Sequence, residues 1–319
     1  MQEIINELKN QDNIVLFVHE NPDGDAIGSI LSMGHALKSI GKDVEAYVEF
    51  FPSNMTFLTD KAPWLKTYNE LDTSRVYNLA VAIDCGDKKR LGVCEEVFDK
   101  ALRTINIDHH ITNDNYANLN YIEPDSAAAG ELVYLLLKGA DIEISSMIAE
   151  TLYLAIVSDT GGFKHQNTSP RSFMIAAELL KTGIEISNIT RKLFYETTVE
   201  RTKCLGEVLS TLTMELDGKV GILTLTPEKL RKYNVDAQEL EGMVDFARDI
   251  RGAEIGIFIK PKDETEYKVS LRSNNYFNVS DLAAGFGGGG HERAAGCRFK
   301  NMSIEEIKEA LLNKIKETL

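Results

Sequence analysis

Residues 14–25 read Ile-Val-Leu-Phe-Val-His-Glu-Asn-Pro-Asp-Gly-Asp, five apolar residues followed directly by a polar turn. A short continuous apolar run is typical of a strand buried on both faces of a parallel sheet. Pro22 and Gly24 favour a turn after that strand, and a helical pattern then continues to about Ile40. The stretch therefore predicts strand, turn and helix, the repeating unit of an α/β fold.

The same alternation continues through the first half of the chain. Apolar runs at 44–48, 79–84 and 104–108 predict further strands, and helical patterns follow near 127–138, 145–157 and 169–181. Residues 1–13 form an amphipathic helical pattern without the continuous apolar core of a signal peptide. We expect an α/β fold with a doubly wound, mainly parallel sheet.

The pattern changes in the second half. Strands are expected at 220–226, 254–260 and 267–272, and helices near 239–250 and 303–316. This order predicts a second, smaller α+β domain. We expect a first domain over 1–186, a helical linker over 187–206 and the second domain over 207–319.

Composition narrows the class of protein. The 319 residues, 43% of them hydrophobic, suffice for two domains, and no apolar run reaches membrane-spanning length. A formal charge of −14 disfavours a broad grip on long duplex nucleic acid. The four cysteines are scattered without a C-x-x-C pair, which favours reduced thiols. We expect a cytoplasmic protein that does not bind membranes.

Acidic and histidine residues follow the apolar runs of the first domain. Because the carboxyl ends of parallel strands share one rim, these side chains should gather there. Carboxylates so placed would repel one another unless divalent cations were bound, so the set predicts a two-metal phosphoesterase site. Each member also has a simpler interpretation, a turn, an N-cap or a hydrogen-bonded core residue. The residues are His19, Asp23, Asp25, Asp84, Asp108, His109, His110 and Asp159.

The second domain contains a run of four glycines followed by a histidine. Such a run lets backbone N–H groups approach an anion, and His291 adds a donor beside them. A flexible hinge is the competing interpretation. Arg272, near a predicted strand end, could recognise phosphate, or could be an ordinary exposed arginine. The candidate substrate-binding residues are Arg272, Gly287, Gly288, Gly289, Gly290 and His291.

The ordered set of motifs resembles the DHH superfamily of phosphoesterases, and the glycine-rich segment resembles its DHHA1 domain. The resemblance covers nearly the whole chain and is strongest to NrnA-type bifunctional oligoribonucleases and 3′-phosphoadenosine-5′-phosphate (pAp) phosphatases. It implies one metal held by His19, Asp23 and Asp84, and another held by Asp25, Asp84, His109 and Asp159. It also implies that His110 contacts the scissile phosphate and that Asp108 orients this loop.

The resemblance implies hydrolysis of short oligoribonucleotides (nanoRNA) to nucleoside monophosphates, or of pAp to AMP, by water that two divalent ions activate. Mn²⁺ is implied, and Mg²⁺ also suits such ligands. The implied partners are short single-stranded RNA or DNA oligonucleotides or pAp, and a homodimer is compatible with the sequence. His165 stands where the family usually has an aromatic residue. Alternatives are a linear dinucleotide (pApA) phosphodiesterase, a family II-like inorganic pyrophosphatase and a non-catalytic nucleotide-binding protein.

Overall fold

The computed structural model describes residues 1–235, 237–240 and 242–318. The chain forms two compact units, Met1–Glu196 and Thr197–Leu319, and each is described by itself.

The first unit is built on a six-stranded sheet in the order β3-β2-β1-β4-β5-β6, with every neighbouring pair parallel. Because β1 and β4 are neighbours, the winding of the chain changes direction between them, and ligands of open α/β sheets bind beyond the strand ends at such a point. The strands are β1 (Ile14–Phe17), β2 (Val44–Val48), β3 (Leu65–Thr67), β4 (Leu79–Ile83), β5 (Arg103–Asp108) and β6 (Leu119–Ile122).

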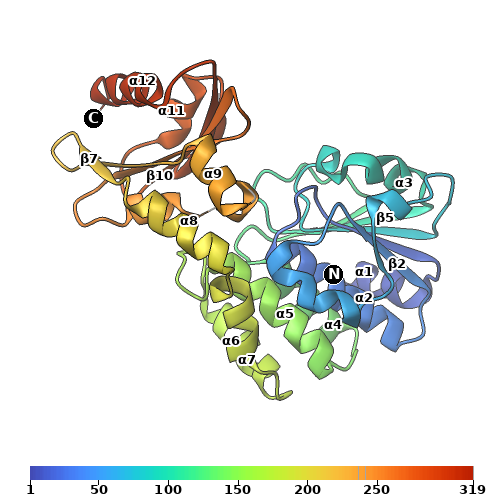
Figure 1. Ribbon diagram of the computed structural model, residues 1–319. Helices are drawn as coiled ribbons and strands as arrows, with labels where there is room; N and C mark the ends of the chain where they lie inside the picture. Colours follow the sequence, from blue (N-terminus) through green and yellow to red (C-terminus); the bar gives the residue numbers. More distant parts are fainter. Residues whose placement is uncertain (236, 241, 319) are drawn as a thin grey trace. The chain divides into compact units, whose positions relative to one another are not determined.

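Helices cover both faces of this sheet, which explains why its central strands are apolar throughout (Figure 1). Alternate strand residues divide between two cores. One core lies against α1 (Gln2–Asn10), α2 (Gly24–Ser39), α4 (Ala129–Gly139) and α5 (Ser146–Asp159). The other lies against α3 (Glu95–Lys100) and the 3₁₀ segment Lys88–Cys94. The unit also contains α6 (Pro170–Leu180), α7 (Ile186–Thr190), the π-helical turn Arg191–Tyr195 and 3₁₀ segments at Ser53–Lys61 and Tyr68–Glu70.

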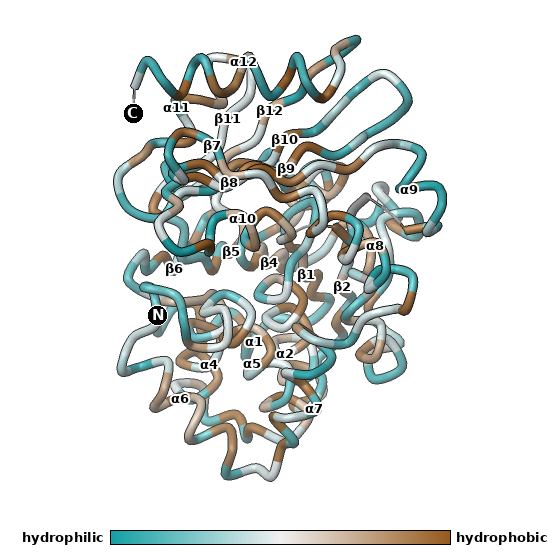
Figure 2. The backbone as a smooth tube through the Cα atoms, turned by 60° about the vertical axis from the view of Figure 1, so that its left-hand side comes forward, coloured by the Kyte–Doolittle hydropathy of each residue, from teal (hydrophilic) through white to brown (hydrophobic). Residues whose placement is uncertain are grey.

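The second unit is built on a mixed sheet in the order β11-β12-β10-β9-β8-β7, in which only β8 and β9 are parallel among the described strands. Its strands are β7 (Thr213–Glu215), β8 (Val220–Thr224), β9 (Ile255–Pro261), β10 (Glu266–Ser273), β11 (Gly289–His291) and β12 (Ala294–Lys300). One face packs on α11 (Val279–Ala284) and α12 (Ile304–Lys316), and the other packs on α8 (Val199–Leu209) and α10 (Val244–Arg248). The short helix α9 (Pro227–Tyr233) and a 3₁₀ turn (Ala237–Leu240) complete the unit. The tube in Figure 2 shows hydrophobic stretches along β8 and β9, where both faces are covered.

The predicted fold class, a doubly wound mainly parallel sheet followed by an α+β part, is confirmed. Two predicted helices are wrong as continuous elements. The segment 187–206 is interrupted at residues 196–198, where Thr198 caps α8 by accepting a hydrogen bond from the Arg201 N–H. The segment 239–250 contains a 3₁₀ turn and the short α10, while Glu241 lies outside the described residues. No helix of the described residues is long and apolar enough to cross a membrane.

Candidate metal centre

Asp84 lies at the centre of the candidate site. It follows directly after β4 and adopts a left-handed backbone conformation (φ 55°), which is uncommon outside glycine and is found at functional sites. Its carboxylate is buried, with Oδ1 3.5 Å from His109 Nε2 and Oδ2 3.6 Å from His19 Nε2. Oδ1 has no hydrogen-bond partner among the described residues. A buried carboxylate oxygen is costly without a hydrogen-bond donor, and a bound metal ion would satisfy it.

His19 and Asp23 approach Asp84 from the turn between β1 and α2. The Nδ1 atom of His19 lies 2.7 Å from the Glu20 carbonyl oxygen, and a proton on Nδ1 leaves Nε2 free as a ligand. Arg90 Nη2 lies 2.9 Å from the same Nδ1 atom, a contact that belongs to the alternative tautomer in which Nδ1 accepts. Asp23 caps α2 through Oδ1, and its Oδ2 lies 4.0 Å from His19 Nε2. The N-cap interpretation of Asp23 is therefore correct, and it leaves one oxygen directed at the cluster.

Asp25, His109 and Asp159 form a second group. His109 Nε2 lies 3.7 Å from Asp25 Oδ2 and 3.4 Å from Asp159 Oδ2. Asp25 is fully buried and accepts hydrogen bonds from the Ala129 and Gly130 N–H groups at 2.5 and 2.9 Å. These two N–H groups belong to the first residues of α4, where a helix has unpaired donors and favours negative charge.

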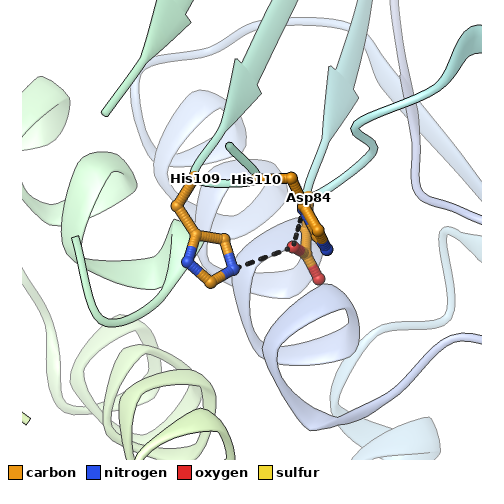
Figure 3. A group of neighbouring side chains, drawn as sticks. All are labelled: Asp84, His109 and His110. Carbon is orange, nitrogen blue, oxygen red and sulfur yellow. Dashed lines mark ion pairs between the residues drawn. The ribbon is translucent and has the colours of Figure 1, made fainter. Parts of the chain in front are cut away.

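His110 is not a member of this second group and is held by Asp108. Its Nδ1 lies 2.7 Å from Asp108 Oδ1, and Asp108 Oδ2 accepts a hydrogen bond from the Asn113 amide at 2.6 Å. The dashed lines in Figure 3 run from both histidines to the same oxygen of Asp84, Oδ1. The centroids of the two rings lie 5.0 Å apart. A Cβ at Gly86 would lie 2.9 Å from His110 Cβ, so glycine is needed for this close approach.

The protonation of the cluster reflects its crowded carboxylates. Burial opposes charge on Asp84, but His109 and His19 outweigh burial and lower the pKa of this carboxyl. Burial, reinforced by the charge of Asp84, raises the pKa of Asp25 well above its ordinary value and that of Asp159 to about 7. Burial lowers the pKa of His109, yet Asp84, Asp25 and Asp159 outweigh it and raise this pKa to about 10. Without cations, protons offset part of the negative charge.

The donor atoms fit two divalent ions. Ligand atoms of His19, Asp23 and Asp84 lie within 4.8 Å of one another, as do those of Asp25, His109 and Asp159. Asp84, His109 and His110 form a third such group, which overlaps both. Carboxylate oxygens with imidazole nitrogens suit Mn²⁺ or Mg²⁺ better than the thiolate sites that select zinc. The structure brings together all eight residues that the sequence singled out in this half of the chain.

In the second unit, Arg272 and His291 lie in one row across the sheet. Arg272 of β10 pairs with Ala294 of β12, and Ala294 pairs with His291 of β11. Directly paired residues of antiparallel strands point to the same face, so both side chains lie on one face, roughly 10 Å apart, with the small Ala294 between them. Arg272 Nε lies 4.0 Å from Asp245 Oδ1, and His291 is exposed.

The glycine run is partly a loop and partly a strand. Gly289–His291 form β11, the edge strand of the described sheet. A Cβ at Gly288 would clash with the Gly296 carbonyl, so glycine is needed here for close packing against β12. Gly287 has φ +72° and open space around it. The run therefore shapes an edge hairpin as well as exposing backbone.

The sequence analysis missed several residues around the cluster. Glu131 is fully buried beside residues 126–130, and Asn113 holds Asp108. Glu131 had a detectable signal, because it is an acid within the apolar pattern of a predicted helix. His165 is exposed, with Nδ1 3.1 Å from the Asp159 carbonyl oxygen.

Comparison with known proteins agrees with this fold. The DHH family, N-terminal domain, matches residues 13–156, and the DHHA1 domain matches residues 217–319. The chain is 32% identical over 308 residues to a curated relative, covering 96% of this chain and 90% of the relative. It therefore belongs to the DHH family and carries a DHHA1 domain, which confirms the resemblance.

That relative is the bifunctional oligoribonuclease and PAP phosphatase NrnA of Thermus thermophilus. The protein of the same name from Bacillus subtilis is 26% identical over 299 residues, covering 92% of this chain and 91% of that protein. A crystal structure of an exopolyphosphatase-related protein from Bacteroides fragilis superposes with a TM-score of 0.89 at 29% identity, covering 98% of this chain and 96% of that one.

Proposed function

We propose that this chain is a divalent-metal-dependent phosphoesterase that hydrolyses short oligoribonucleotides to nucleoside monophosphates and pAp to AMP. The observation that carries the proposal is the convergence of two ligand groups on the buried Asp84, whose Oδ1 lacks a hydrogen-bond donor among the described residues. The names of the full-length relatives support the choice of substrate.

In this proposal His19, Asp23 and Asp84 hold one cation, and Asp25, Asp84, His109 and Asp159 hold the other. Mn²⁺ is the preferred ion and Mg²⁺ the second candidate, since the donors are oxygen and imidazole nitrogen. Two bound cations would supply an activated water and neutralise charge on the phosphoryl oxygens.

The chain's own residues supply orientation. Asp108 accepts the Nδ1 proton of His110, so the opposite ring nitrogen of His110 is presented to a phosphoryl oxygen. In the second unit, Arg272 and His291 share one sheet face and would contact a phosphate of the substrate, together with backbone N–H groups of Gly287–Gly290. We assign metal binding and catalysis to residues 1–186, the connection to 187–206 and substrate binding to 207–319.

One assay panel tests the proposal. Purified protein is given pAp, pApA, a five-nucleotide RNA, pyrophosphate and polyphosphate, each with Mn²⁺, with Mg²⁺ and with chelator. We expect Mn²⁺-dependent hydrolysis of pAp and of the short RNA. Faster turnover of pyrophosphate or polyphosphate would refute the nucleotide assignment. Turnover that survives removal of metal would refute the metal centre.

A further inference from the structure

Residues 126–130 contact two members of the second ligand group, His109 and Asp25. The His109 Nδ1 atom lies 3.1 Å from the Ser126 carbonyl oxygen, which directs the opposite nitrogen, Nε2, at the carboxylates. A few residues later, the Ala129 and Gly130 N–H groups hold the Asp25 carboxylate. A single backbone segment thus fixes the orientation of His109 and Asp25 together.

The third member of the group, Asp159, is tied to the same segment. The side-chain amide of Asn167 donates to the Ala127 carbonyl oxygen at 3.0 Å and to the Asp159 carbonyl oxygen at 3.1 Å. The end of α5, which carries Asp159, is therefore linked through Asn167 to residues 126–130.

Glu131 anchors this segment from inside the protein. Its side chain is fully buried and accepts hydrogen bonds from the hydroxyls of Ser126 and Ser172, at 3.0 and 2.5 Å, and from Arg171 Nε at 2.9 Å. Burial of a carboxylate is costly unless it is paired and hydrogen-bonded, and removing its partners or the group itself shifts the surrounding structure. The segment that presents Ser126, Ala129 and Gly130 is thus held by a buried charge.

The other ligand group is fixed independently. His19 is oriented by the Glu20 carbonyl, Asp23 by the N–H groups of its own helix, and Asp84 by its position at the end of β4. Within the described part of the chain, no hydrogen bond joins Glu131 to these three residues.

We infer that Glu131 is a positioning residue: it holds residues 126–130 in place and thereby fixes the arrangement of the ligands Asp25, His109 and Asp159. It does not fix the arrangement of His19, Asp23 and Asp84. The inference rests on the proposed two-metal function. Replacing a residue behind a ligand typically lowers metal affinity about 10–100-fold. Loss of Glu131 should therefore affect the two cations unequally, whereas a merely structural role would affect both alike.

Variants that keep only one of the two metal sites allow the effect on each cation to be measured separately. The measurements are calorimetric titration with Mn²⁺ and electron paramagnetic resonance of the bound Mn²⁺. The His19→Ala protein retains only the site that Glu131 supports, and the Asp159→Ala protein retains only the other. We expect Glu131→Ala to raise the Kd for Mn²⁺ about 10–100-fold in the first background. In the second background the Kd should change by less than roughly two-fold, as for independent positions.

Two further variants keep the test decisive if Glu131→Ala folds poorly. Ser126→Ala removes one hydroxyl contact between the segment and Glu131 and leaves the contact of the Ala127 N–H with Glu131, at 3.4 Å, in place. Glu131→Gln keeps an acceptor and should restore part of the affinity. The matched control is Glu123→Gln, since the Glu123 carboxylate also pairs with Arg171, at 2.8 Å, but its side chain is partly exposed. Equal changes in both backgrounds, or an equal effect of Glu123→Gln, would overturn the positioning role alone. A wild-type protein that binds no Mn²⁺ would overturn the metal centre itself and this role with it.

Discussion

Asp84 Oδ1 lies 3.5 Å from His109 Nε2 in the interior of the first unit, and this oxygen has no hydrogen-bond partner among the described residues. The other oxygen of the same carboxylate faces His19 at 3.6 Å. One buried side chain thus faces both imidazoles that we propose as metal ligands, so it is placed to bridge two cations.

Asp84→Ala should abolish turnover, because in the proposed centre both cations share this carboxylate. We expect kcat/KM to fall more than about 10³-fold, equivalent to about 4 kcal/mol of transition-state stabilisation. Circular dichroism should show a folded protein. Asp87→Asn is the control, because Asp87 is exposed on the same loop. Among the described residues, its carboxylate accepts a hydrogen bond from the Lys89 N–H. An Asp84→Ala protein that binds two Mn²⁺ and turns over normally would refute the bridging role.

Replacing His109 and replacing His110 should have different effects on metal binding and on kcat. His109 directs Nε2 at three carboxylates, whereas His110 is hydrogen-bonded to Asp108 and its side chain is more exposed, at 35% against 14%. His109→Ala should therefore lower the affinity for Mn²⁺, and His110→Ala should lower kcat with both metals retained. Metal stoichiometry measured beside kcat checks this, and identical stoichiometry in the two variants would contradict it.

Asp159→Asn should stabilise the metal-free protein at high pH. The native state holds the Asp159 proton up to about pH 7, while the unfolded state releases it near the ordinary pKa of 3.8. Between these values the native state binds more protons, so the free energy of unfolding falls as pH rises. Asparagine avoids this loss, and the gain should be on the order of 1–3 kcal/mol at pH 8 and smaller at pH 4.5.

Urea unfolding with chelator at both pH values measures this gain, and the exposed Asp125→Asn is the control. Saturating Mn²⁺ should reverse the order of stability, because the wild type then gains binding free energy that the variant lacks. A variant that is less stable than the wild type without metal at pH 8 would show that the carboxylate is not under electrostatic strain.

The rim of the first sheet was predictable from sequence because β1 and β4 are apolar throughout and are followed by polar residues. β5 contains Ile105 and Ile107 and ends at Asp108. Parallel strand ends meet at one edge of a sheet. Asp159 was harder, since a helix-terminal acid before glycines is ordinarily a turn. The short strands β3 and β6 carry neither alternation nor full burial, so no pattern marks them. The strand β11 escaped prediction because glycine disfavours strands, and pairing with β12 overrides that preference.

The residues that hold the proposed ligands in place could not be predicted from the sequence, for a different reason. Glu131 meets Ser172, and Asp25 meets Gly130, across more than 40 and 100 residues respectively. Such contacts depend on how helices pack on the sheet, and local periodicity carries no information about them. The register that aligns Arg272 with His291 through Ala294 is likewise a property of strand pairing and not of any one strand.

Substrate length provides the last prediction. If Arg272 and His291 bind a terminal phosphate, that contact contributes the same free energy to every substrate, whereas each added nucleotide brings a further phosphate toward a chain of charge −14. We expect kcat/KM to be higher for 2- and 5-nucleotide RNAs than for a 24-nucleotide RNA. Arg272→Ala should raise KM for the short substrates about 10-fold or more and leave Mn²⁺ binding unchanged.

The matched control for this change is Arg298→Ala, which removes the same charge four residues from Ala294 along β12, where the arginine side chain is 63% exposed. It should leave KM for the short substrates unchanged, because an exposed arginine outside the Arg272 and His291 row is not expected to contact a terminal phosphate. A substrate without a terminal phosphate should respond little to Arg272→Ala, which separates phosphate recognition from a general loss of positive charge. Flat length dependence in the wild type, or an unaltered KM for the short substrates in Arg272→Ala, would refute terminal-phosphate binding by this row.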